Sequence, residues 1–157
     1  MKYVVLVLFA GVIFHAHAQT DDELRKQADL ELLKEESRSA LFYINRIQKR
    51  VDDDNLREVE AELLRASNNN NARHQLESFS KNDAIRKSTY LSYLSALIEY
   101  QQRNFNEVIS ILQRVRKRNS KIQFLAGKAF LDLNNVDSAN SCFNAALKGF
   151  QKDSVNS

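Results

Sequence analysis

The N-terminal part of the chain carries apolar residues at alternating steps of three and four, which is the spacing of one face of an α-helix. From residue 21 to residue 52 this pattern predicts a single long helix. Its buried stripe has seven positions, namely Leu30, Leu33, Ser37, Ala40, Ile44, Ile47 and Val51. The acidic run at residues 21–23 favours a helix start there, because carboxylates stabilise the positive end of the helix dipole.

A second apolar stripe follows a polar interruption at residues 52–55. It continues to residue 67 through Leu56, Val59, Leu63 and Ala66. Two amphipathic helices joined by a short turn cover their stripes by packing antiparallel, so residues 19–67 are predicted to form a helical hairpin. A dimeric coiled coil is the alternative explanation of the same spacing.

The middle of the chain, residues 68–88, is predicted to hold a loop and a short helix. The Asn-rich run at residues 67–71 favours a loop, because Asn tolerates left-handed turn conformations. Residues 72–81 are expected to form the short helix. The apolar periodicity then strengthens again from residue 83 to residue 100.

Residues 89–150 contain two copies of one pattern, offset by 31 residues. The aligned pairs are Ala96 with Gly127, Phe105 with Val136, Val108 with Ala139, Leu112 with Phe143, and Val115 with Ala146. Each copy predicts a helix, a tight turn and a second helix. The expected caps of the second helices are Asn104 or Asn106 in the first copy and Asn135 or Asp137 in the second.

The pattern resembles the tetratricopeptide repeat, in which a small residue of the first helix lies against a small residue twelve positions later. Gly127 and Ala139 have this interval, and Ala146 follows at the next interval of seven. The residues expected to pack the repeats are Ala96, Val108, Val115, Gly127, Ala139, Phe143 and Ala146. The resemblance implies an all-α fold of antiparallel helical hairpins, with a solenoid over residues 89–150. Residues 40–73 are a candidate third copy, and an ordinary helical bundle is the alternative.

The resemblance also implies a peptide-binding groove along the first helices of the repeats. Its lining would be Tyr90, Tyr93, Leu97, Tyr100, Lys121, Phe124, Lys128 and Leu131. Tyrosine suits such a surface, because it offers a large contact area with few rotatable bonds. The alternative is that these tyrosines pack against the preceding helix.

The first 18 residues have the features of a secretory signal peptide. One Lys precedes an apolar run of eleven residues, and Ala16-His17-Ala18 provides small residues at the spacing that a signal peptidase recognises. We expect cleavage after Ala18 and an exported protein, either periplasmic or extracellular. An uncleaved anchor is the alternative, but eleven apolar residues fall short of the ~20 that a spanning helix needs.

The amino-acid composition limits the folds and the functional sites that the chain can form. The 157 residues include no Pro and three Gly, which favours helices joined by short polar loops. The formal net charge of +3 is too small to indicate nucleic-acid binding. Cys142 is the only cysteine and is expected to be a small apolar residue of the core. We find no catalytic constellation and no metal-ligand spacing, so neither an enzyme nor a cofactor is predicted.

A basic run at the end of the first repeat is the strongest charge feature, and it comprises Arg114, Arg116, Lys117 and Arg118. Cations at a helix C-terminus complement the dipole, so a structural role explains the run. The functional alternative is a docking patch for an acidic partner or for anionic lipid at a membrane surface.

These features predict a non-enzymatic module that binds a protein or peptide partner. The alternative function is a structural bundle that associates with itself as a subunit of an envelope assembly. Only a short polar tail, residues 151–157, follows Phe150, so no further helix covers the outer face of residues 137–150. We expect that face to be partly exposed and to contact a partner or a second copy of the chain.

Overall fold

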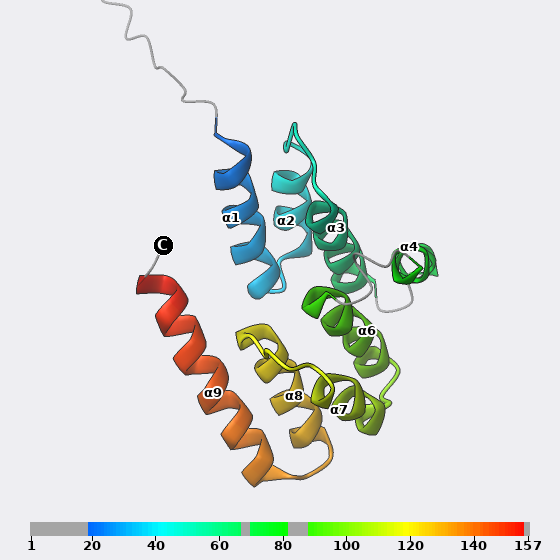
Figure 1. The fold of residues 1–157 in the computed structure, drawn as a ribbon, viewed down its shortest axis with the longest axis vertical. Coiled ribbons are helices and arrows are strands. Elements are labelled where there is room, and N and C mark those ends of the chain that lie inside the picture. Colours follow the sequence, from blue (N-terminus) through cyan, green and yellow to red (C-terminus); the bar gives the residue numbers. More distant parts are fainter. Residues whose placement is uncertain (1–18, 67–69, 82–87, 156–157) are drawn as a thin grey trace, which may run out of the picture.

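The computed structural model describes residues 19–66, 70–81 and 88–155, and every regular element within them is an α-helix (Figure 1). The helices are α1 (Asp21–Leu33), α2 (Ser37–Ile44), α3 (Asp52–Arg65), α4 (Asn70–Ser80), α6 (Thr89–Gln101), α7 (Phe105–Gln113), α8 (Ser120–Asp132) and α9 (Val136–Val155). The predicted all-α class is confirmed. The predicted signal peptide lies outside the described residues.

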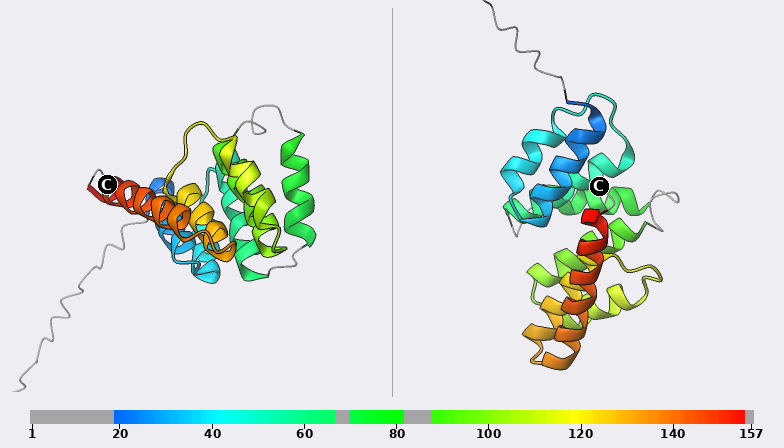
Figure 2. Two further views of the ribbon diagram at one scale, coloured as in Figure 1. Left: turned by 90° about the horizontal axis from the view of Figure 1, so that it is seen from below. Right: turned by 90° about the vertical axis from the view of Figure 1, so that its left-hand side faces the viewer.

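Helices that are neighbours along the chain pack against each other from α1 to α9. The helices α1, α3, α6 and α8 also contact one another in that order and so form a continuous row. The left view of Figure 2 places α4 and α9 at opposite sides of the molecule. One cluster of buried apolar residues joins α1, α2 and α3, and a larger one extends from α3 to α8, with Leu64 packed against both.

Small residues occupy the same place in three helix pairs. The first member of each pair lies eight residues after the N-cap of its helix, and the second lies twelve residues later. The pairs are Ala28–Ala40, Ala96–Val108 and Gly127–Ala139, and all six residues are buried. A Cβ atom on Gly127 would lie 2.5 Å from the Phe143 ring, so this ring occupies the space that a larger residue would need.

The turn between the two helices of these pairs also repeats. Glu35, Arg103 and Asn134 each lie fifteen residues after the N-cap and have φ angles of 60°, 64° and 58°. The amide of the next residue donates to a carbonyl five residues back, for example Asn135 to Phe130 at 2.8 Å. This left-handed C-terminal turn fits Asn, whereas a longer side chain raises its cost.

The prediction of one helix from residue 21 to residue 52 is wrong. The chain turns back between α1 and α2, with Glu35 in the left-handed conformation. The sequence-based stripe continued through this turn because Leu30, Leu33 and Val51 fit its spacing, yet all three are exposed. The buried positions of α1 are instead Leu24, Ala28 and Leu32. The twelve-residue contact of the N-terminal part therefore joins α1 to α2.

The other helices lie closer to the positions that the sequence predicts for them. The predicted short helix at residues 72–81 is confirmed as α4, although it begins at Asn70, within the predicted loop. Residues 151–155 of the predicted polar tail belong to α9. Asn135 caps α9, because its Oδ1 accepts from the Ser138 amide at 3.1 Å. The Asn104 side chain makes no cap bond to α7 and donates to Glu99 instead.

The C-terminal helix α9 extends past α8. Gly149 lies against Ser120 in the first turn of α8, so the chain from Phe150 onwards projects beyond that helix. Phe150 is partly exposed, as expected. Leu147 is 56% exposed, because Ala139, Phe143 and Ala146 form the face toward α8.

Replacing Gly127 by Leu should lower the free energy of unfolding by about 1–3 kcal/mol, because the new side chain enters the space of the Phe143 ring. Chemical denaturation of the single variant measures this cost. The same substitution in a Phe143→Ala background should cost less. An equal cost in both backgrounds would contradict the contact.

Replacing Arg103 by Gly should raise the free energy of unfolding by about 0.5–1 kcal/mol, because glycine adopts the left-handed turn without a Cβ penalty. Urea denaturation is the measurement. Arg103→Ala is the control, since it removes the charge and keeps the Cβ atom, and it should give no gain. Equal gains would assign the effect to the lost side chain.

Candidate functional site

A buried carboxylate connects three helices of the row. Glu60 of α3 is fully buried and accepts hydrogen bonds from the hydroxyls of Tyr90 and Tyr93, the latter at 3.2 Å. The Lys121 ammonium of α8 lies 3.1 Å from the same carboxylate and over both tyrosine rings, 5.5 and 5.8 Å from their centroids. This Glu60 cluster therefore fixes α6 and α8 against α3.

The two tyrosines of the Glu60 cluster are held in the neutral form. Burial raises the pKa of Tyr90 and of Tyr93 well above the ordinary value, and the adjacent Glu60 carboxylate raises both further. Each phenol then serves as a hydrogen-bond donor to Glu60 and not as a proton acceptor. The arrangement suits structural anchoring of α6 and α8 to α3.

A second lysine of α8, Lys128, lies about two turns further along the same face of the helix. Lys128 Nζ is 3.1 Å from Glu35 in the turn between α1 and α2, and it lies 5.1 Å from the Tyr100 ring centroid. The Tyr100 hydroxyl donates to Asp132 at 2.6 Å. Burial, together with Asp132, raises the pKa of Tyr100 to about 12. Lys128 thus joins the first helix pair to the last one.

The predicted groove residues do lie together, but the space between them is largely filled. The end of α1 contributes Leu32 and Leu33 to a cavity of about 30 Å³, and the turn that follows contributes Glu35. Its other lining residues are Tyr93, Leu97, Lys121, Phe124, Leu125 and Lys128. Such a volume has room for about one water molecule. The two tyrosines of the Glu60 cluster contact Glu60 of α3 and Lys121 of α8, so they pack within the helix row.

Three apolar side chains remain available to solvent around Lys128. Leu33 at the end of α1 is 39% exposed, Phe124 on α8 is 41% exposed, and Leu131 two turns further is 52% exposed. We call Leu33, Phe124, Lys128 and Leu131 the Lys128 surface. This surface thus combines three exposed apolar side chains with one ion pair, Lys128–Glu35.

A second buried carboxylate, which the sequence analysis missed, fixes α1 in place. Asp54 of α3 is fully buried and accepts from Arg25 of α1 at 3.0 Å and from Arg57 at 3.2 Å. Burial raises the pKa of Asp54, but hydrogen bonds from Arg25 and the Val51 amide outweigh it, so the pKa lies below its ordinary value. The signal in the sequence is weak, since three acids in a row at residues 52–54 indicate a helix start and do not single out the third.

The basic run lies where α7 ends and the loop to α8 begins. Arg114, Arg116, Lys117 and Arg118 are all exposed. Arg118 donates to the Gln113 carbonyl at 3.4 Å, which agrees with the expected structural role at a helix C-terminus. Cys142 packs against the larger apolar cluster, and burial raises the pKa of its thiol. A raised pKa disfavours the reactive thiolate.

Further findings bear on the class of function. Among the described residues, no group of His, Cys, Asp and Glu side chains is placed to hold a metal ion. None of the helices seen in the structure has the length and apolar character needed to cross a bilayer. Comparison with known proteins finds no matching family model, no matching curated protein and no matching solved structure.

Replacing Lys121 by Met should lower the free energy of unfolding by about 3 kcal/mol, because Glu60 would keep a buried charge without its cation. Thermal and urea denaturation measure the loss. The double variant Glu60→Gln/Lys121→Met should be more stable than Lys121→Met alone, since the unpaired charge is removed. If it is less stable, Glu60 does not carry a buried charge.

Proposed function

We propose that this protein is an exported, non-enzymatic interaction module of tetratricopeptide-like helical hairpins that binds a protein partner. The regular twelve-residue contacts between small residues and the repeated left-handed turn support the tetratricopeptide-like arrangement. A third such unit lies at α1 and α2, where Ala28 and Ala40 have the same spacing as Gly127 and Ala139. This unit covers residues 21–44, whereas the candidate third copy in the sequence covers residues 40–73.

The Lys128 surface is the observation on which the binding proposal depends. It presents three apolar side chains from α1 and α8 on a frame that the Glu60 and Asp54 carboxylates fix internally. A rigid apolar surface loses little conformational entropy on binding, so most of the contact energy is retained as affinity. The partner would bury Leu131 and Leu33 at the centre of its contact, around the Lys128–Glu35 pair.

Export is the second part of the proposal, and the N-terminal sequence supports it. A basic residue, an apolar run and small residues at positions 16 and 18 precede the first described helix. The capping of α1 by Thr20, whose Oγ1 accepts from the Glu23 amide at 3.3 Å, is compatible with a mature chain that starts at Gln19. The partner would then be an envelope or extracellular protein.

Self-association through α9 is the second candidate function, and a specific observation favours it. Leu147 is 56% exposed on a helix that projects beyond α8. A second copy of the chain docked on this face would cover it. This assembly would form a structural bundle in the envelope and would not need the Lys128 surface.

Site-specific photo-crosslinking tests the proposed partner surface. A benzophenone amino acid is introduced at Leu131 or at Leu147 in the expressed full chain, and the adducts formed in cells are identified by mass spectrometry. We expect position 131 to give a defined adduct with a different protein. Leu33→Asp should abolish that adduct, because it places an unpaired charge in the contact.

The control and the alternatives are separated by the same experiment. Position 147 has similar exposure but lies on α9, so a common adduct at both positions would indicate non-specific capture. An adduct of the chain with itself at position 147, together with none at position 131, would contradict the partner proposal and favour the self-associating bundle. Cell fractionation of the same samples reports whether the chain is exported.

A further inference from the structure

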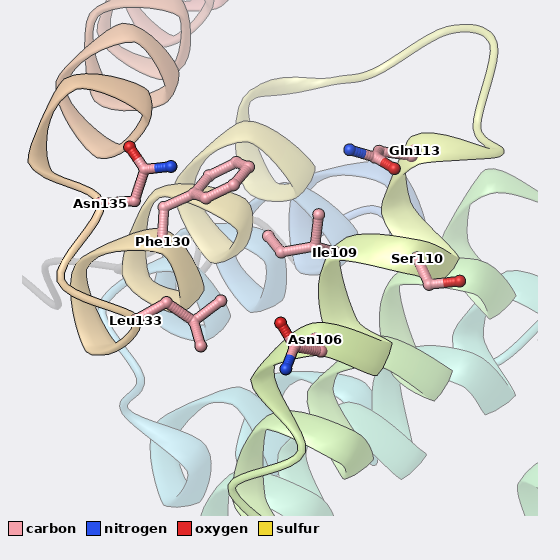
Figure 3. Close-up of a pocket in the computed structure, with 7 residues that line it drawn as sticks. All are labelled: Asn106, Ile109, Ser110, Gln113, Phe130, Leu133 and Asn135. Carbon is pink, nitrogen blue, oxygen red and sulfur yellow. The ribbon is translucent and has the colours of Figure 1, made fainter.

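A groove of about 440 Å³ lies between α7 and the turn that joins α8 to α9 (Figure 3). Its apolar part is formed by Ile109, Phe130 and Leu133, and its polar part by Asn106, Ser110, Gln113 and Asn135. None of the seven side chains is charged. The volume is in the range of known ligand sites, and the proposed function above does not use this groove.

The polar groups of the groove match those of a peptide backbone. Asn106, Ser110 and Gln113 follow one another at steps of four and three on α7, so they form one stripe along the groove. Within the described part of the chain, the side-chain amides of Asn106 and Gln113 make no hydrogen bond to protein. An amide has both a donor and an acceptor, like the peptide group, so it can pair with an extended segment.

An extended segment uses these amides better than a helix does. The backbone groups of a helix already bond to each other, whereas those of an extended chain need partners. The apolar part of the groove, with Phe130 opposite Ile109, can take one apolar side chain of that segment. The chemistry therefore favours an extended peptide with an apolar anchor.

The basic run continues from one end of this groove. Arg114 donates to Ser110 Oγ at 2.8 Å, and Arg118 donates to the carbonyl of Gln113, so both cations adjoin lining residues. Figure 3 shows the loop rising from the end of α7 that carries Gln113. No carboxylate of the described residues forms an ion pair with Arg114, Arg116, Lys117 or Arg118. A neutral groove thus adjoins a basic run of four cations that have no anionic partner among the described residues.

From this juxtaposition we infer that the groove binds an extended acidic peptide, whose apolar residue contacts Ile109 and Phe130 and whose carboxylates reach the basic run. The helix rises about 6 Å from Ile109 to the end of α7 at Gln113, which about two extended residues would span, and the basic run begins at the next residue. The ligand motif is accordingly one apolar residue separated by that distance from two or more acidic residues. This inference adds a site separate from the Lys128 surface.

Selection from a random ten-residue peptide library displayed on phage, with the full chain immobilised, tests the site. We expect enrichment of the motif described above. Synthetic copies of the enriched peptides should bind at least tenfold more weakly to Arg116→Glu/Lys117→Glu and to Leu133→Asp, as measured by fluorescence anisotropy. Raising the salt concentration should weaken binding, because exposed charges are screened.

Two control variants test whether a loss of peptide binding is specific to the groove and the basic run. Lys26→Glu/Lys148→Glu changes the net charge equally at exposed positions elsewhere and should leave peptide affinity unchanged. Leu131→Asp carries the same substitution as Leu133→Asp, but residue 131 lies on the opposite side of α8, since two residues subtend about 200°. Circular dichroism confirms that each variant is folded.

Several outcomes overturn the inference. These are the absence of any enriched motif, enrichment without acidic residues, or affinities that Leu133→Asp leaves unchanged. Loss of binding in Leu131→Asp alone would show that the peptides bind the Lys128 surface. That result would support the proposed function and overturn this site. Binding to phosphatidylserine vesicles that depends on Arg116 and Lys117, without any peptide binding, would assign the basic run to a membrane surface.

Discussion

The close approach of paired helices at small residues is the constraint on which the rest of the structure depends. The helices α2 and α7 have eight and nine residues, and isolated helices of this length are marginal in water. They are stable only when packed, and Ala40 and Val108 place them against the helices that precede them. Because side chains at these points are small, the distance between the helices is set largely by their backbones. The larger side chains then fill defined spaces, as Phe143 does over Gly127.

Apolar packing alone leaves the relation between successive pairs loosely defined, since it has little directional preference. The carboxylates of Glu60 and Asp54 supply directional hydrogen bonds and ion pairs between the helices of successive pairs. Each is fully buried on α3 and is surrounded by donors from neighbouring helices, so displacement of those helices would leave a buried charge without partners. These two interactions fix α1 and α8 against α3, and the Lys128 surface is formed by residues of α1 and α8. Its exposed leucines and Phe124 are placed by groups that are themselves hidden from solvent.

The sequence predicts the C-terminal half well, because the signals there are local. Gly127 and Ala139 lie twelve residues apart within one unit, and the structure buries both. The N-terminal half was misjudged, since leucines at helical spacing run through the turn at Glu35 and conceal it. The Ala28–Ala40 interval was visible in the sequence, but it is recognised only after the N-cap of α1 is known. Five of the eight predicted groove residues line one small cavity, which leaves no open groove between them. The partners of their hydroxyls were not predictable, because Glu60 is one of three acids, with Glu58 and Glu62, that alternate with apolar residues, and it lies 30 residues from Tyr90 in the chain.

The contact between Glu35 and Lys128 spans 93 residues of sequence. It connects the turn of the first helix pair to the last one, beside the small cavity that Leu32 and Leu33 close. In a stack of hairpins, each hairpin contacts only its neighbours, so the stack as a whole can be extended or twisted at a low energetic cost. Here Lys128 of α8 pairs with Glu35 in the turn after α1, so extension of the stack would also separate these two side chains. This pair should therefore add only a small resistance to extension, because a partly exposed ion pair contributes on the order of 1 kcal/mol or less.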